Sequence, residues 1–302
     1  TWHGRPALLA EHVARTPSDG VSPEKYAWVI DVFDDQGRRL AHKEYPGRDK
    51  PLIADGRRVV VEHGTGGNSG ALVVSDAGGD APGWRIPCQD SGCVHEGATV
   101  AAGVVVHSSR QRVGDDDIET LAAFDPNSGA PLWTTRDLAR PAEVPATADA
   151  ELIKNDGGKL VLAWYVGTYG APRFHTETYS VHDPATGRLL ATGPTLPGSA
   201  KTGLATPDGT VMVVATTDST AAWETGTGKP LWQQAKDEKR LAPVAVVGPV
   251  LYSGQDPSMA VDLRTKTVLQ RTVSDMPVPV GTEHAVVTRA PGVAYVFAVQ
   301  RG

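Results

Sequence analysis

The sequence has 302 residues, of which 40% are hydrophobic and 21% are charged. This composition excludes a disordered chain, and no run reaches the roughly 18 uncharged apolar residues that a membrane-spanning helix needs. The net charge of −6 disfavours nucleic acid and anionic membrane surfaces as partners, because both repel a negatively charged protein.

Taken in chain order, short runs of β-branched and aromatic residues alternate with turns rich in Gly, Pro, Asn, Asp and Thr, a pattern that predicts strands. In each of seven units, one such run comes directly before the turn: YAWVIDVF, GALVVS, TLAAF, TYSV, TAAW, SMAV and AYVFA. A second apolar run lies upstream of each, from ALLAEH to HAVVTR. A shorter segment before it and a short strand after the turn bring the expected number to about four strands a unit.

One phrase recurs along the chain. AAFDPNSGAPLW (122–133) returns as AAWETGTGKPLW (221–232) and, less completely, as SVHDPATGRLLA (180–191). Its acidic position, here called the anchor, gives a repeat of about 43 residues. The anchors are Asp34, Asp76, Asp125, Asp183, Glu224, Asp262 and Gln300. Seven four-stranded antiparallel units predict an all-β, seven-bladed β-propeller that occupies residues 1–302 as a single domain.

The two ends of the chain suggest how the ring closes. The last unit stops before its fourth strand, and Trp2 could supply the missing residue. We therefore expect the N-terminal strand to complete the last blade, which would remove an exposed sheet edge. The chain starts at Thr1 rather than Met, as a processed or excised chain would, so an export signal or a membrane anchor could precede it.

The two cysteines, Cys88 and Cys93, are separated by four residues. That spacing does not fit the C-x-x-C redox motif, and there is no second cysteine pair to complete a zinc site. The remaining interpretations are a disulfide or two unrelated thiols. A disulfide is predicted, and because it needs an oxidising compartment, it indicates an extracytoplasmic protein.

The recurring phrase resembles the tryptophan-docking repeat of the quinoprotein (PQQ-like) β-propeller superfamily. The positions that match are Ala222, Glu224, Thr227, Gly228, Lys229 and Trp232 in one unit, Ala123, Asp125, Ser128, Gly129 and Trp133 in a second, and Ala260, Asp262 and Thr265 in a third. In that superfamily the tryptophan packs against the adjacent blade. The resemblance therefore implies structural docking roles for Trp2, Trp84, Trp133 and Trp232.

The resemblance also bears on activity and cofactor. The quinone-dependent dehydrogenases of the superfamily have eight blades, about twice this length and a disulfide between adjacent cysteines. This chain has seven units, and Cys88 and Cys93 are not adjacent, so neither PQQ nor redox catalysis is expected. Shorter relatives are extracytoplasmic scaffold lipoproteins and sensor domains of membrane-anchored bacterial kinases. The richness in Ala, Gly, Arg and Asp suggests a high-GC bacterium such as an actinomycete.

Three histidines lie at equivalent strand ends and could indicate a metal site, as in some propeller lyases. The residues concerned are Glu11, His12, Glu62, His63 and His107. Equivalent positions on neighbouring blades should be about 10 Å apart, whereas zinc needs ligands at about 2 Å. Polar strand ends are therefore favoured. A lyase or hydrolase that uses these residues, with or without a divalent metal, is the alternative.

Connections between the second and third strands are long in units one to four and short in units five to seven. Long loops on a rigid scaffold often carry binding function, although neutral drift or local hairpin packing would also account for them. The candidate binding residues are Arg110, Arg112, Tyr165, Tyr169, Arg173, Phe174 and His175. The sequence thus favours a non-enzymatic scaffold or sensor that presents this face to a protein, peptide or glycan of the cell envelope.

Overall fold

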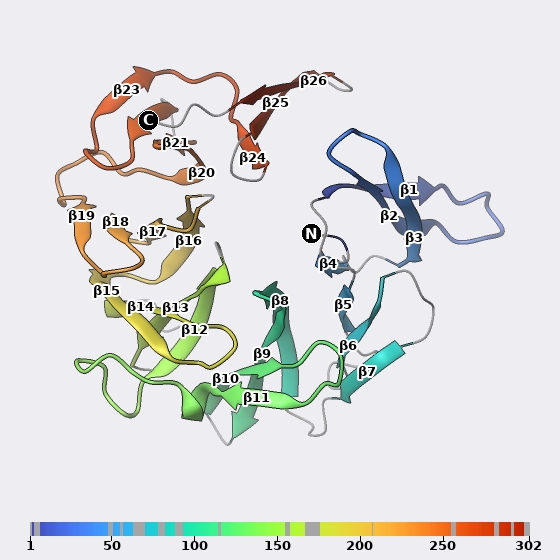
Figure 1. Cartoon of the computed structure of the whole chain (residues 1–302), viewed down its shortest axis with the longest axis horizontal. Coiled ribbons are helices and arrows are strands. Elements are labelled where there is room, and N and C mark those ends of the chain that lie inside the picture. The colour runs from blue at the N-terminus through green and yellow to red at the C-terminus, as the bar shows by residue number, and fades with distance from the viewer. Residues whose placement is uncertain are drawn as a thin grey trace. The chain divides into compact units, whose positions relative to one another are not determined.

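The chain is all-β in its computed structural model (Figure 1). The structure describes residues 2, 7–47, 51–54, 57–62, 70–77, 82–87, 93–113, 116–154, 158–166, 176–206, 208–254, 258–280, 284–290 and 293–298. None of the helical segments in these ranges is both long and apolar enough to cross a membrane.

Residues 1–132 form one compact unit. Its strands make three antiparallel sheets, here numbered 1 to 3 in chain order. Sheet 1 contains β1 (Leu8–Thr16), β2 (Lys25–Phe33) and β3 (Arg39–Pro46). Sheet 2 contains β4 (Leu52–Ala54), β5 (Arg57–Glu62), β6 (Ala71–Asp76) and β7 (Pro82–Pro87). Sheet 3 contains β8 (Cys93–Ala101), β9 (Val104–Val113), β10 (Asp116–Phe124) and β11 (Pro131–Thr134).

Residues 133–302 form the second compact unit, which begins inside β11. A short 3₁₀ helix, η1 (Thr135–Asp137), precedes sheets 4 to 7. Sheet 4 contains β12 (Asp149–Lys154), β13 (Leu160–Tyr165), β14 (Thr176–His182) and β15 (Leu189–Pro197). Sheet 5 contains β16 (Ala200–Ala205), β17 (Val211–Thr216), β18 (Thr220–Glu224) and β19 (Pro230–Gln233). Sheet 6 contains β20 (Pro243–Val247), β21 (Val250–Ser253), β22 (Met259–Asp262) and β23 (Val268–Arg271), and sheet 7 contains β24 (Val278–Val280), β25 (His284–Ala290) and β26 (Val293–Ala298).

The seven sheets correspond one to one with the seven predicted units, so the predicted seven-bladed β-propeller is confirmed as the fold class. In each unit with a described anchor, the anchor ends or directly follows the strand before the last turn, as Asp76 does in β6 and Asp125 does after β10. By this alignment sheet 1 lacks a first strand and sheet 7 lacks a fourth, among the residues described. Trp2 forms a β bridge, and closure of the ring by the N-terminus stays a prediction.

Within each compact unit, the core residues come mainly from the second and third strands of consecutive sheets. In the second unit, β13 and β17 are buried along their whole length, because each has a strand on both edges and packed side chains on both faces. Trp223 and Tyr179 are fully buried in this core, with ring centroids 5.7 Å apart. Burying side chains of this size stabilises the fold by roughly 2–3 kcal/mol each.

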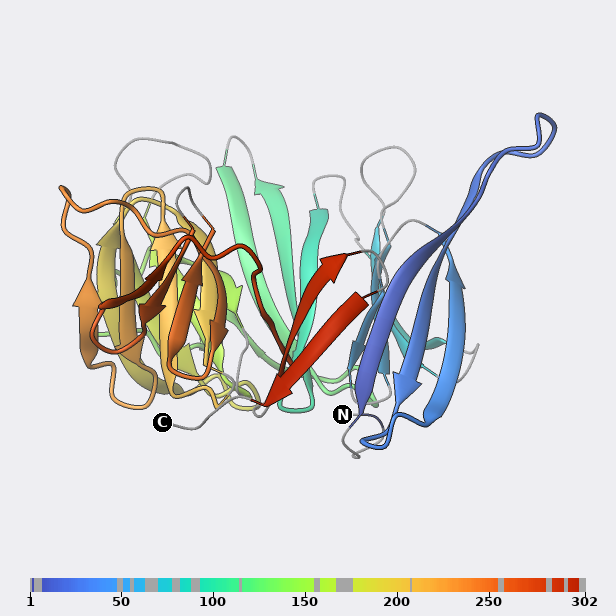
Figure 2. The ribbon, with the colours of Figure 1, turned by 90° about the horizontal axis from the view of Figure 1, so that it is seen from above.

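One of the predicted long loops, residues 108–119, is mostly strand, and a second, residues 13–25, is shortened at both ends by strand. β1 and β2 pair over nine residues each, from Leu8 with Phe33 to Thr16 with Lys25. β9 and β10 also pair over nine, from Val105 with Phe124 to Val113 with Asp116. The expectation of a loop was wrong for most of residues 108–119 and right for residues 17–24. Polar residues on an exposed face of a hairpin look like loop residues in sequence. Figure 2 shows the β1–β2 hairpin extending beyond β3.

Candidate functional site

The anchor carboxylates hold the turns that end the third strands. Oδ1 of Asp183 accepts hydrogen bonds from the backbone N–H groups of Ala185 (3.0 Å) and Thr186 (2.9 Å) and from the Thr186 hydroxyl (2.9 Å). These bonds favour the ionised carboxylate, so they lower the pKa of Asp183. Asp125 and Asp262 make the same set of three bonds.

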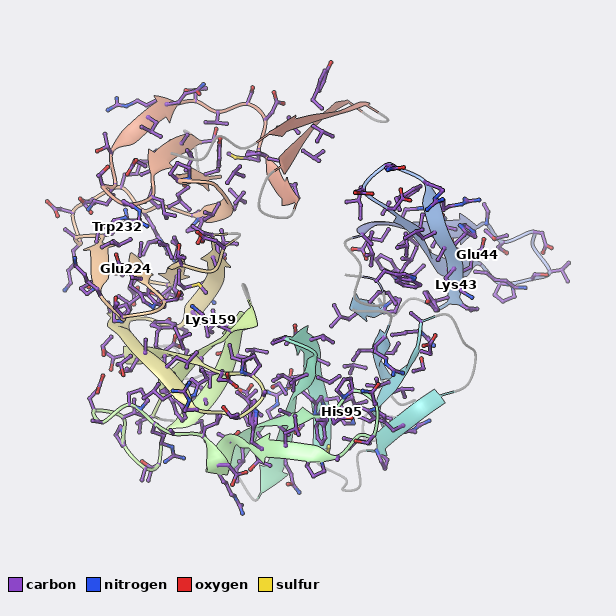
Figure 3. All side chains as sticks on the ribbon, viewed as in Figure 1. Lys43, Glu44, His95, Lys159, Glu224 and Trp232 are labelled. Carbon is purple, nitrogen blue, oxygen red and sulfur yellow. The ribbon has the colours of Figure 1, made fainter. Side chains whose placement is uncertain are left out.

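Three tryptophans donate to the carbonyl that directly follows an anchor. The bonds run from Nε1 of Trp84 to Pro126 O (2.9 Å), from Trp133 to Pro184 O (2.7 Å) and from Trp232 to Leu263 O (2.7 Å). Figure 3 shows Trp232 close to Glu224 on sheet 5. Each indole thereby covers an apolar area and satisfies a carbonyl that the turn leaves without a partner.

Two docking contacts have no tryptophan, and sequence reasoning missed them. The Tyr45 hydroxyl donates to Ala77 O (3.0 Å), and Ala77 directly follows the anchor Asp76. Lys159 Nζ donates to the hydroxyl of Thr225 (3.3 Å), which directly follows the anchor Glu224. To find these contacts in the sequence, one would have to accept any long side chain with a hydrogen-bond donor in place of the tryptophan. That criterion is far less specific than a tryptophan eight residues after an anchor.

Glycines in the anchor turns allow other residues to pack closely against the backbone of the turn. Gly129 has φ +70°, and a Cβ there would lie 2.8 Å from the Trp84 ring. Gly228 has φ +72°, and a Cβ there would lie 1.8 Å from Thr192 O. Both the positive φ and the contact exclude a side chain at these positions.

A buried histidine pair joins β8 and β9 in sheet 3. Nδ1 of His95 and Nε2 of His107 are 2.6 Å apart, and both residues are 4% exposed. One of the two nitrogens carries the shared proton. Burial, with a smaller contribution from the charge of His95, lowers the pKa of His107 to about 3, so the His107 imidazole is neutral at physiological pH. Sequence reasoning found His107 but missed His95 (labelled in Figure 3).

A second buried network crosses sheet 4. Trp164 Nε1 donates to Ser180 Oγ (2.6 Å), Ser180 Oγ is 2.8 Å from His182 Nε2, and His182 Nδ1 is 3.0 Å from Gly187 O. Since a carbonyl only accepts, Nδ1 carries the proton and Nε2 accepts from the serine. Burial lowers the pKa of His182. Ser180 and His182 are completely buried, so this serine–histidine pair is a structural network with no access for a substrate.

The alternative catalytic residues lie in different surroundings. His12 is exposed on β1, opposite Val29, whereas His107 is buried beside His95. Glu11 is exposed next to His12. His63 and the Glu62 side chain lie outside the described residues. Within the described ranges no three His, Cys, Asp or Glu side chains form a group that could hold a metal. The lyase or hydrolase alternative stays a prediction.

The candidate binding residues are only partly described. Arg110 lies in β9 and pairs with Glu96 (2.5 Å). Tyr165 ends β13 and is 6% exposed, so its assignment as a surface binding residue was wrong; its ring belongs to the core of sheet 4. Cys93 is disulfide-bonded, and its predicted partner lies outside the described part of the chain. The others outside it are Cys88, Tyr169, Arg173, Phe174, His175 and the side chain of Arg112.

The tip of the β1–β2 hairpin is an ordered, exposed turn. Asp19 Oδ1 accepts from the N–H groups of Val21 (2.9 Å) and Ser22 (2.6 Å), and the Ser18 hydroxyl donates to Ser22 O (2.8 Å). Val21 is 95% exposed at this tip. At the base of the turn, Tyr26 donates to Glu24 (2.5 Å). The hairpin therefore holds an aliphatic side chain in water on a hydrogen-bonded support.

Comparison with known proteins agrees with this architecture. Residues 176–287 match the family described as outer membrane protein assembly factor BamB, and the chain is a β-propeller with PQQ-like repeats. It is similar to the Hsv2 structures of Kluyveromyces marxianus (9% identity, 92% of this chain and 94% of that chain, TM-score 0.54) and Kluyveromyces lactis (10%, 92% and 95%, 0.50). BamB from Moraxella catarrhalis matches at 18% identity over 90% of this chain and 78% of that chain, with a TM-score of 0.46. No curated protein matches.

Proposed function

We propose that the protein is a non-enzymatic binding or scaffold propeller of the extracytoplasmic space that holds a protein or peptide partner. The observation that carries this proposal is the β1–β2 hairpin, which pairs over nine residues and presents Val21 on an ordered tip. A rigid support of this kind lowers the entropy lost on binding, because the contact residues are already ordered. Glycan remains an alternative ligand for the same face.

Two further observations support the proposal. The family that matches residues 176–287 is described as outer membrane protein assembly factor BamB, and the assembly of proteins requires contact with them. The disulfide-bonded Cys93 favours an oxidising compartment. A sensor role in an actinobacterial envelope, without PQQ or another cofactor, is the more specific form of the proposal.

The test is site-specific photo-crosslinking in the organism that makes the protein. A photoreactive amino acid in place of Val21 should give a discrete crosslink to one polypeptide. The matched control replaces Gln36, an exposed residue in the turn between β2 and β3, and should give none. Equal labelling from both positions, or no discrete crosslink from Val21, would contradict the proposal.

The enzymatic alternative has its own test. Thermal unfolding of metal-stripped protein is followed with and without divalent ions, beside the His12→Ala/His63→Ala/His107→Ala variant. A metal ion that binds the folded protein and is present at a free concentration of a hundred times its Kd adds about 2.7 kcal/mol to the free energy of unfolding. The scaffold proposal expects no such shift, and a shift that the triple variant loses would favour the lyase or hydrolase.

A further inference from the structure

The tip of the β1–β2 hairpin, residues 17–24, projects from sheet 1 as a single turn. The hairpin extends beyond the end of β3 (Figure 2), and residues 17–23 are all exposed. Val21 in this turn is 95% exposed, more than any other large hydrophobic side chain that the structure describes. The tip is therefore a convex surface with one prominent aliphatic side chain.

Hydrogen bonds within the tip hold Val21 in one place. The N–H group of Gly20 donates to Ser18 Oγ (3.2 Å), and Asp19 Oδ1 accepts from the N–H groups of Val21 and Ser22. Gly20 has φ +88°, and a Cβ there would have nothing within 4 Å, so this glycine is needed for the backbone conformation of the turn. The turn is thus formed before any partner binds.

The tip also presents one negative charge. Asp19 is the only ionisable residue between Arg15 and Glu24, which form an ion pair with each other at the base of the tip. The backbone N–H groups of Ser22 and Val21 lower the pKa of Asp19, so its carboxylate is ionised at neutral pH. A carboxylate has about four acceptor sites, and the two bonds of the turn leave about half of them for a partner.

The shape of the tip decides which class of partner fits it. Small ligands, short glycans among them, bind in concave sites, and extended peptides add to a sheet edge or lie in a groove. A helix or loop that enters a bilayer presents several large apolar side chains, whereas Val21 is the only large aliphatic residue in residues 17–23. The partner must therefore supply the concave surface, as a folded protein does.

We propose that the hairpin tip inserts into a pocket of a folded partner protein, with Val21 at the apolar base of the pocket and the Asp19 carboxylate against a cationic or N–H donor at its rim. This inference rests on the proposed binding function and names its partner class. A few buried anchor side chains carry most of the affinity of a protein interface. The preformed turn adds to that affinity because little conformational entropy is lost on binding.

The first experiment distinguishes a folded pocket from a short linear segment. Photoreactive residues replace Thr16, which is exposed beside the tip, and Val21, one at a time in the native organism. Mass spectrometry then locates the attached atoms of the partner. A pocket predicts one polypeptide, attached at positions that are far apart in its sequence because different walls of the pocket face the two residues. Attachment of both residues to one short segment, to a glycan or to lipid would overturn the proposal.

The second experiment tests the two side chains while the photoreactive residue stays at Thr16. Val21→Ala should lower the crosslink yield about tenfold. The matched control, Val268→Ala at an exposed valine of β23, should leave the yield unchanged. Asp19→Asn keeps an oxygen that can close the turn but removes the charge, and it should lower the yield about fivefold. All three variants should melt close to the wild-type temperature, because the altered side chains are exposed.

The outcomes separate this inference from the proposed function. A discrete crosslink from Thr16 to one polypeptide that Val21→Ala does not weaken would reject insertion of the tip and leave the binding function in place. A wild-type yield in Asp19→Asn would reject the charged contact at the rim. The absence of a discrete crosslink from both Thr16 and Val21 would reject the inference together with the proposed function.

Discussion

Sheets 1 and 5 carry the same repeat but treat their second strands in opposite ways. In sheet 5, β17 is buried along all six residues, with Val213 and Met212 in the core on its two faces. In sheet 1, β1 is mostly exposed, and its sequence LLAEHVART includes the charged residues Glu11 and Arg15, whereas β17, VMVVAT, has none. The difference teaches that equivalent strands of the repeat are buried to different extents, in keeping with their composition and with the strands that pack against them.

The docking contacts differ in the same way. Trp232 of sheet 5 donates to Leu263 O with an indole, whereas sheet 1 uses the Tyr45 hydroxyl on Ala77 O. The acceptor occupies the same position in both contacts, because each carbonyl belongs to the residue directly after an anchor. The donor can therefore change while the contact persists.

The largest expected effect comes from the turn glycines. Gly228→Ala forces a Cβ to 1.8 Å from Thr192 O and should destabilise the protein by about 4 kcal/mol or more. Gly37→Ala in sheet 1, at φ +76° with nothing within 4 Å, should lose only the conformational strain of about 1–2 kcal/mol. Urea unfolding of both variants measures the comparison. Equal losses of unfolding free energy in the two variants would show that the contact between residue 228 and Thr192 O does not add to the conformational strain.

Acid should weaken sheet 3 through its histidine pair. The pKa of His107 is lowered to about 3 in the folded chain, so the unfolded state binds more protons once the pH falls below about 6.5. Stability is then lost progressively from pH 6.5 towards pH 3, by about 3 kcal/mol between pH 7 and pH 4. Urea unfolding at these two pH values should show the loss, and His107→Gln should flatten it. A His107 resonance that titrates near pH 6.5 would contradict this.

Removing a docking donor should have an intermediate effect. Trp232→Phe leaves Leu263 O without its donor and removes part of a packed ring, a loss of about 2 kcal/mol. Tyr45→Phe removes only a hydroxyl and should lose about 1 kcal/mol. Thermal unfolding of the two variants tests the ranking. A larger loss from Tyr45→Phe would show that sheet 1 depends on its docking contact more than sheet 5 does.

The smallest effect is expected at the surface of sheet 1. Asp31 lies 2.8 Å from Nδ1 of His42 and, mainly through this hydrogen bond, raises the pKa of His42. The raised pKa adds stability that is fully present below pH 6.5 and is lost as the pH rises through the folded value, the reverse of His107. His42→Gln should lower the melting temperature slightly at pH 5.5 and not at pH 9. An equal change at both values would exclude the ion pair as the cause.

The sequence by itself determined the repeat, the seven sheets and the anchor turns. Each of these depends on residues close together in the chain: Asp183 and Thr186 are three apart, and a turn glycine such as Gly228 is needed for local backbone reasons. The three tryptophans with described bonds were also visible in sequence, because they keep a constant distance from the anchor.

Only the tertiary structure decided whether residues at equivalent positions of the repeat are buried or exposed. His12 and His107 occupy similar places in the sequence, yet one is exposed and the other is buried beside His95, a residue on another strand. Tyr165 is buried and β1 is mostly exposed for the same reason. Burial depends on which side chains of other strands pack against a residue, and the short stretch of sequence around that residue does not contain those strands.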